Sequence, residues 1–171
     1  YEATFFLTAN MQNAAMELNK PSKSNTTVSS AKGKGTASKP ASTNTKPLIV
    51  NLKVVQNVMQ YDKKLITVKP GQKVILHFGN PDFMQHNLLI LKPNSMEKVG
   101  LAADRMVTDP NGAKMHYVPK MSEVIAATPM INPGGKFTLT VKIPNIPGDY
   151  PFVCTFPGHW RIMNGILRVT K

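Results

Sequence analysis

The residues best suited to chemistry lie within ten positions near the C-terminus, where residues 154–163 read CTFPGHWRIM. This segment holds the only cysteine of the chain, Cys154, together with His159 and Met163. Thiolate, imidazole and thioether groups are soft ligands that favour copper, and two histidines, one cysteine and a weak axial methionine form the blue-copper electron-transfer site. The second histidine is missing from the segment, and His86 can supply it. The sequence therefore predicts a mononuclear copper site.

Each of these residues also has an ordinary structural interpretation. A lone cysteine is often a small buried hydrophobic residue, and Met163 fits a core position. Zinc accepts histidine and cysteine as well, although a thioether is a poor zinc ligand. A multicopper oxidase needs His-x-His pairs and a binuclear centre needs a second cysteine, and the chain has neither. Because four ligands would fill the coordination sphere, we expect electron exchange and no enzyme activity.

Composition narrows the class of protein further. The 171 residues, 42% of them hydrophobic, suffice for one domain with an extension. No apolar run approaches the ~18 residues of a transmembrane helix, and a single cysteine excludes an intramolecular disulfide. The net charge of +12 favours an acidic partner. Nucleic acid is not expected as a partner, because the lysines are scattered and no nucleic-acid-binding motif is present.

The first 46 residues differ in composition from the rest. Residues 3–19 predict a weak helix, and residues 20–47 are rich in Lys, Ser, Thr, Ala and Pro, which is typical of a flexible linker or tether. The chain begins with Tyr1 rather than methionine, so we expect a processed chain whose export signal has been removed. We therefore predict an N-terminal extension over 1–46 and a folded domain over 47–171.

The folded domain shows the period-two pattern of β-strands. Hydrophobic and polar residues alternate over 136–143, which predicts a half-buried strand. The other predicted strands are Leu48–Val55, Leu65–Val68, Lys73–Phe78, Asn87–Leu91, Ser122–Ala126, Tyr150–Val153 and Gly165–Thr170. About eight short strands separated by Pro and Gly turns predict an all-β antiparallel sandwich. Residues 95–108 are the exception: they predict a helix capped by Ser95, within a flap that extends to about residue 118.

A sandwich can bring the four ligand candidates together. Its ends collect loops from strands that are distant in sequence. His86 begins one predicted strand, Cys154 ends another, and Met163 precedes the last one. We expect all of them at one end of the domain.

The segment Cys-Thr-Phe-Pro-Gly-His, followed by a methionine four residues later, resembles the copper loop of azurin, a member of the cupredoxin family. Residues 84–87 resemble the first-histidine segment of the same family, and the helical insertion resembles the azurin flap. The resemblance covers most of 48–171. It implies a Greek-key β-sandwich and one type 1 copper ion that transfers single electrons.

The resemblance also implies a role for individual residues. His86, Cys154 and His159 would be the equatorial ligands, and Met163 the weak axial one. Asn87 would tie the two ligand loops together, and the backbone amide of Phe156 would donate to the cysteine sulfur. His159 would be the partly exposed ligand through which electrons leave. An apolar docking patch around it would comprise Met84, Phe156, Pro157 and Trp160.

Two features depart from the family pattern. Azurin has a glycine before the first histidine, and its carbonyl lies near copper on the face opposite the methionine. Gln85 stands there in this chain, and its backbone carbonyl would take the same weak axial role. The azurin disulfide is missing as well. In addition, Trp160 and Arg161 place an aromatic ring and a cation beside the electron port, which indicates a partner with acidic groups around its redox centre.

The leading hypothesis is a type 1 blue-copper electron-transfer protein, with a cytochrome c or a respiratory or dehydrogenase complex as partner. A copper delivery or storage module and a redox module of a larger respiratory assembly are the alternatives. The resemblance implies a periplasmic or otherwise extracytoplasmic location. The other histidines receive modest interpretations, His77 a structural role and His116 a surface position.

Overall fold

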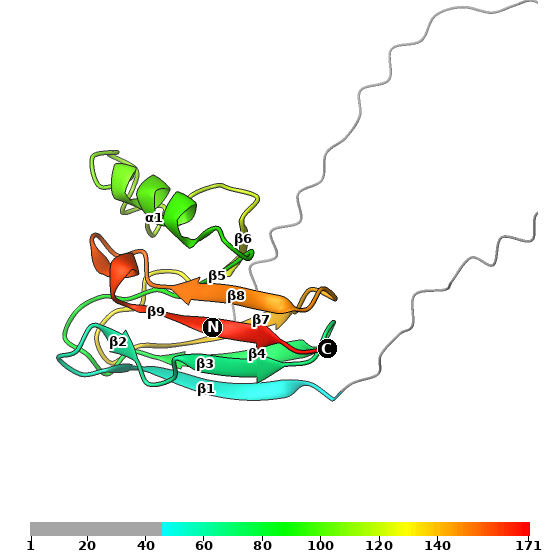
Figure 1. Cartoon of the computed structure of the whole chain (residues 1–171). Coiled ribbons are helices and arrows are strands. Elements are labelled where there is room, and N and C mark those ends of the chain that lie inside the picture. Colours follow the sequence, from blue (N-terminus) through cyan, green and yellow to red (C-terminus); the bar gives the residue numbers. More distant parts are fainter. Residues whose placement is uncertain (1–45) are drawn as a thin grey trace, which may run out of the picture. The chain divides into compact units, whose positions relative to one another are not determined.

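The computed structural model describes residues 46–171, which form two packed β-sheets and one helix (Figure 1). The predicted helix at 3–19 and nearly all of the predicted linker lie outside the described residues. The domain boundary between residues 46 and 47 therefore stays a prediction. No helix in the described part is long and apolar enough to cross a membrane.

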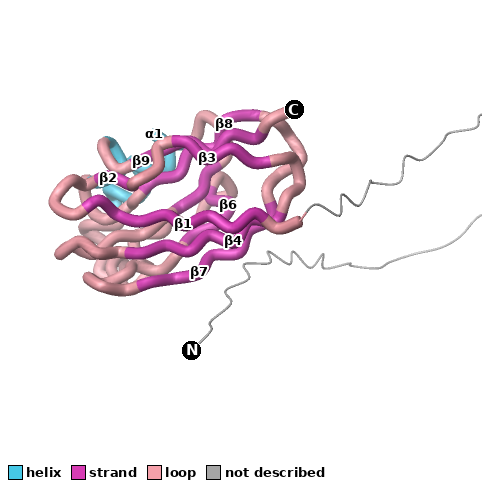
Figure 2. Tube along the Cα trace, turned by 90° about the horizontal axis from the view of Figure 1, so that it is seen from below, coloured by secondary structure: helices cyan, strands magenta, loops and turns pink. Residues whose placement is uncertain are grey.

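The first sheet contains four strands in the order β2-β1-β4-β7, and Figure 2 shows β1, β4 and β7 side by side. Their bounds are Leu48–Val55 for β1, Gln60–Tyr61 for β2, Lys73–Gly79 for β4 and Lys136–Lys142 for β7. Buried and exposed residues alternate along β1 and β7, as period-two patterning requires. This sheet therefore has one face in the core and one face in solvent.

The second sheet contains five strands in the order β3-β9-β8-β5-β6. Their bounds are Leu65–Val68 for β3, Leu89–Leu91 for β5, Val124–Ala127 for β6, Gly148–Val153 for β8 and Asn164–Val169 for β9. Every residue of β5 and the last four of β8 are buried. Burial on both sides shows that something covers the outer face of this sheet.

The expectation of an all-antiparallel sandwich is wrong for two strand pairs. β1 pairs with β4 in parallel, and β3 pairs with β9 in parallel. In both pairs the partners are separated by other structure, which leaves chain enough for the crossover that a parallel pair needs. The sheets are therefore mixed, while the two-layer sandwich itself is as predicted.

A single apolar core joins the two sheets. It is formed by inward-facing side chains of both layers, and its largest fully buried members include Tyr61, Phe78, Phe152 and Leu167. The Tyr61 ring packs 6.0 Å from Phe78 and 5.4 Å from Phe152, measured between ring centroids. The core cluster also contains Cys154 and Met163, so two of the ligand candidates are themselves core residues.

Helix α1 (Met96–Arg105) covers the outer face of the second sheet (Figure 1). A second apolar cluster lies between them, formed by Leu89, Leu91, Val99, Val153 and Trp160. This cover explains why β5 and β8 are apolar on both faces. Ser95 precedes the helix as predicted, but its hydroxyl donates to the Lys92 carbonyl, so it does not act as a side-chain cap. Irregular turns follow α1 up to residue 117 and complete the flap.

Candidate metal centre

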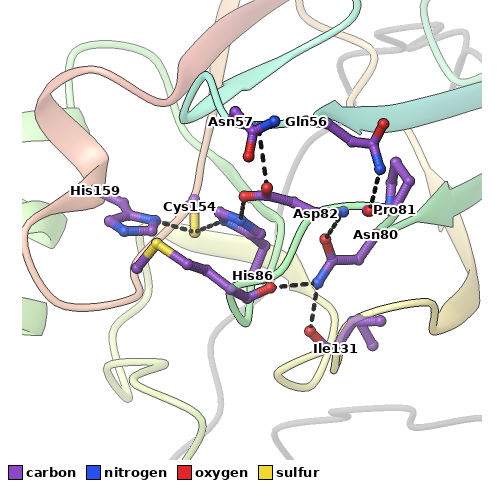
Figure 3. A network of polar contacts seen from close by, with 10 residues as sticks. Gln56, Asn57, Asn80, Pro81, Asp82, His86, Ile131, Cys154 and His159 are labelled. Atoms are coloured by element: carbon purple, nitrogen blue, oxygen red, sulfur yellow. Dashed lines mark hydrogen bonds and ion pairs between the residues drawn. The ribbon is translucent and has the colours of Figure 1, made fainter.

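Three buried side chains converge at the end of the sandwich that carries the flap. One ligand atom each from His86, Cys154 and His159 lies within 4.8 Å of the other two. The sulfur of Cys154 is 3.8 Å from Nδ1 of His86 and 3.7 Å from Nδ1 of His159 (Figure 3). All three residues are buried, with exposed fractions of 0%, 0% and 3%. No other His, Cys, Asp or Glu group of this kind occurs within residues 46–171.

These distances fit a trigonal metal site. Metal–nitrogen and metal–sulfur bonds of about 2.0 and 2.3 Å, separated by 120°, would leave nitrogen and sulfur about 3.7 Å apart. Both imidazoles present Nδ1 to the sulfur, so the three donors face a common point. A set of two histidines and one cysteine is the trigonal set that copper selects. The residues present therefore fit a copper ion.

The backbone of the C-terminal ligand loop is closed on itself. Gly158 adopts a left-handed conformation (φ 82°), which begins the short 3₁₀ helix η1 (His159–Arg161). The Met163 amide donates to the His159 carbonyl at 2.8 Å, and the Cys154 amide donates to the Met163 carbonyl at 3.0 Å. These bonds fix the backbone positions of Cys154, His159 and Met163 relative to one another.

Asn87 joins the two ligand segments. Its side-chain oxygen accepts from the Thr155 amide at 2.7 Å, and its side-chain nitrogen donates to Thr155 Oγ1 at 2.8 Å and to the His116 carbonyl at 2.9 Å. The hydroxyl of Tyr61, itself buried, donates to the Asn87 carbonyl at 2.7 Å. Asn87 is thus hydrogen-bonded to both the Cys154 loop and the flap, while its backbone follows directly on His86.

Burial sets the protonation states of the metal-free site. Desolvation raises the pKa of the Cys154 thiol to about 12, although the backbone amides of Asn87 and Phe156 donate to the sulfur and act in the opposite direction. Desolvation, together with the neighbouring His86, lowers the pKa of His159 to about 4. At neutral pH the pocket therefore presents a thiol and an uncharged His159, and a metal ion must displace the thiol proton to bind.

The structure adds a residue that the sequence reasoning missed. Asp82 is buried, and its Oδ2 lies 2.9 Å from Nε2 of His86. The pKa of the Asp82 carboxyl lies below its usual value. Desolvation by burial alone would raise this pKa, but hydrogen bonds from the Asn57 amide, His86 and the Phe83 amide outweigh that effect. In the sequence, Asp82 stands out only by its position four residues before His86. Residues four apart are neighbours on a helix, but Asp82 lies in a loop, so the spacing did not predict the contact.

Met163 and Gln85 are the two candidates for axial ligands. Met163 is fully buried, in the same core cluster as Cys154. The side chain of Gln85 is exposed and donates to Asn132 Oδ1 at 2.6 Å. Only the backbone of Gln85 remains for the weak axial role proposed for it.

Trp160 differs most from expectation. It is 7% exposed, in the cluster beneath α1, so it does not belong to an exposed docking patch. Its indole N–H donates to both carboxylate oxygens of Asp104, at 3.1 and 3.2 Å. Arg161 forms an ion pair with the same carboxylate at 3.0 Å and lies over the indole ring at 4.2 Å. This arrangement fastens α1 to the turn that carries His159, and Asp104 offsets the charge of Arg161.

Replacing Gly100 with alanine should weaken the packing of α1 against the Trp160 ring. A Cβ at Gly100 would lie 2.5 Å from Cε2 and 2.6 Å from Cε3 of Trp160. Overpacking of this depth costs up to about 3 kcal/mol, and the gain of about 1 kcal/mol in helix propensity offsets part of it. We expect a net loss of about 2 kcal/mol in urea unfolding. Trp160→Leu should remove the clash, so in that background the same change should become neutral or stabilising; a stabilising effect in the wild-type chain would contradict the proposed contact.

The remaining predicted residues lie around this centre. Phe156 is half-buried and packs 4.8 Å from the His159 ring, which explains why His159 is less exposed than expected. Met84 and Pro157 are half-buried, as members of a docking patch can be. His77 is exposed and bonds Thr138 Oγ1 at 3.0 Å, away from the three ligand candidates. His116 is exposed, as predicted, and its carbonyl receives the bond from Asn87.

Comparison with known proteins agrees with this geometry. Residues 48–170 match the family model described as copper binding proteins, plastocyanin/azurin family. The chain is 30% identical to auracyanin-A of Chloroflexus aurantiacus over 72% of its length and 75% of the relative's. It is 32% identical to azurin-1 of Alcaligenes xylosoxydans xylosoxydans over 65% of its length and 89% of the relative's. The solved structure of auracyanin A, described as a "blue" copper protein of Chloroflexus aurantiacus, matches with a TM-score of 0.66 and 29% identity, over 73% of this chain and all of that one.

The chain belongs to the plastocyanin/azurin family of copper-binding proteins, the cupredoxins. The predicted Greek-key sandwich and the resemblance to azurin are thereby confirmed. The His86, Cys154 and His159 cluster is consistent with one type 1 copper ion as the cofactor.

Proposed function

We propose that this protein is a one-electron carrier whose copper ion is held by His86, Cys154 and His159, with Met163 as the weak axial ligand. A bound copper ion supplies the Cu(II)/Cu(I) couple. The observation that carries the proposal is the buried convergence of two imidazole nitrogens and one thiol sulfur within 4.8 Å. A set of four protein ligands would leave no open position for a substrate, which favours electron exchange over catalysis.

The chain's own residues act by holding the site still. Asn87 and the closed backbone of the C-terminal loop fix the ligands from both sides. The amides of Asn87 and Phe156 donate to the Cys154 sulfur and stabilise its thiolate form. A site that is already formed changes little between two oxidation states, and small reorganisation favours rapid electron exchange.

The surface around the ligand loops supports docking of a redox partner. Met84 and Pro157 are half-buried, and two strongly exposed apolar residues flank the ligand segments, Phe83 (69% exposed) and Ile162 (51%). The domain carries more basic than acidic residues, since residues 48–171 contain fifteen Lys or Arg and seven Asp or Glu. We infer a redox protein with an acidic docking surface as the partner, met outside the cytoplasm. Scattered lysines, rather than the Asp104-paired Arg161, would provide most of the attraction.

Spectroscopy of the copper-loaded protein tests the proposal. After addition of Cu(II), we expect an intense blue or green absorption and a narrow copper hyperfine splitting in the paramagnetic-resonance spectrum, because a thiolate ligand takes spin density from copper. Reductant should bleach the colour and oxidant should restore it. Cys154→Ser should lose both signals. His77→Gln is the matched control, since it removes an exposed histidine away from the cluster, and it should leave the spectrum unchanged.

A different outcome would move the function to another class. A colourless protein that binds Cu(I) or zinc equally well would contradict electron transfer and favour copper delivery or storage. A normal blue centre that is reduced only within a complex, and not by freely diffusing partners, would favour a redox module of a larger assembly.

A further inference from the structure

Behind the first ligand histidine lies a buried carboxylate. Asp82 and His86 have side chains that are 2% and 0% exposed, and Asp82 Oδ2 is 2.9 Å from His86 Nε2. Figure 3 shows Asp82 on the far side of the imidazole from Cys154 and His159. An ionised carboxylate can only accept hydrogen bonds. Nε2 of His86 must therefore carry a proton, and in the neutral ring Nδ1 then holds the lone pair on the side of the sulfur.

The carboxylate is itself held in place. Its other oxygen accepts from the Asn57 amide at 3.0 Å, and its own amide donates to Asn80 Oδ1 at 3.1 Å. The side-chain nitrogen of Asn80 in turn donates to the carbonyls of Met84 and Ile131, at 2.7 and 2.9 Å. The backbone of His86 pairs with Ile131 in both directions. These hydrogen bonds connect Asp82 to the loops of Asn57 and Asn80 and, through Asn80, to the pairing of His86 with Ile131. They hold the Asp82 carboxylate against the imidazole.

Among the described residues, no lysine or arginine neutralises Asp82, whose only ion-pair partner is His86. The four other ion pairs of the described part each contain a Lys or Arg and lie at least partly in solvent. A buried charge without a cation is costly. A metal ion bound through His86 would supply the missing positive charge.

We propose that Asp82 is a positioning residue that fixes the Nε2–H tautomer of His86 and lowers the reduction potential of the bound copper. The inference rests on the proposed function. The oxidised site carries one positive charge more than the reduced site. A fixed negative charge in a low-dielectric interior therefore stabilises the oxidised form more strongly.

Redox titration of the copper-loaded protein tests the effect on the potential. Asp82→Asn keeps the size of the side chain and removes its charge, so we expect a higher reduction potential than in the wild type. Asp104→Asn is the matched control, because it removes the same charge beside the turn that carries His159, but from a side chain that is 31% exposed and therefore screened by water, whereas Asp82 is 2% exposed. Its shift should be clearly smaller. A potential in Asp82→Asn that is unchanged, lowered or shifted no more than in Asp104→Asn would overturn the proposal.

A second measurement decides the tautomer without copper and without a variant at Asp82. Nitrogen-15 NMR of the imidazole rings of the metal-free wild type, assigned by comparison with His86→Gln, should show the His86 proton on Nε2. A proton on Nδ1 would overturn the proposal even if Asp82→Asn fails to fold. A wild type that binds no redox-active copper would refute the proposed function, whereas a reversible blue wild type with an unaltered Asp82→Asn potential would refute only the role of Asp82.

Discussion

Asn87→Ala is expected to destabilise the domain by about 3 kcal/mol and to disturb the metal centre at the same time. Asn87 is fully buried and makes three side-chain hydrogen bonds, two of them to Thr155 beside Cys154. Its loss would leave the buried Thr155 amide without an acceptor, at about 1–3 kcal/mol, in addition to the lost bonds and the cavity. Urea unfolding of the metal-free protein measures the first effect. A broadened or shifted visible band of the copper form measures the second.

The control for this variant is Asn145→Ala. Asn145 is exposed in the turn before β8, so its removal should change stability by less than about 0.5 kcal/mol. If Asn87→Ala were equally mild, the bonds between the ligand segments would not hold them together, and the packing of the core alone would have to position Cys154.

The stability of the metal-free protein should be greatest between about pH 6.5 and 9 and should fall on both sides. Below pH 6.5 His159 becomes protonated in the unfolded chain, whereas in the folded protein, where its pKa is about 4, it stays neutral. Stability is therefore lost as the pH falls from 6.5 to 4, by up to about 3 kcal/mol. Above pH 9 an unfolded Cys154 releases a proton that the folded thiol, with its pKa of about 12, retains. Stability is lost again as the pH rises from 9 to 12, by up to about 4 kcal/mol.

Urea unfolding across this pH range, on wild type and two variants, separates the two effects. His159→Gln should flatten the acid side. Cys154→Ser should lessen the alkaline decline without abolishing it, because burial also raises the pKa of Tyr61 and adds a loss in the same direction. If stability depended on pH in the same way in the wild type and in both variants, the lowered pKa of His159 and the raised pKa of Cys154 would both be contradicted.

Local patterning predicted the strands well, because alternation of buried and exposed residues is written directly into the chain. The bounds of β1 and β3 coincide with the prediction, and those of most other strands differ by one or two residues. The pairing directions were not accessible in the same way. Whether β1 runs parallel or antiparallel to β4 does not change which of its side chains face the core.

The ligand set was accessible because its residue types are rare and their spacing is specific. Its surroundings were not, since they depend on contacts between distant segments. Trp160 looks like a surface aromatic in a loop, and only the position of α1, with Gly100 beneath the indole, makes it a core residue. Asp82 likewise gains its meaning only when the loop folds back on His86.

The place of β9 in its sheet governs the order in which the molecule can be completed. This strand lies between β3 and β8 and is the only sheet neighbour of β3 among the described strands, so β3 has no sheet partner until the segment that follows the ligand loop is available. Such long-range pairing gives a high contact order, which slows folding. The ligand loop immediately precedes β9 and is closed by the same event. Copper capture is thus coupled to the docking of β9, and a folding domain offers no finished metal site until that strand is in place.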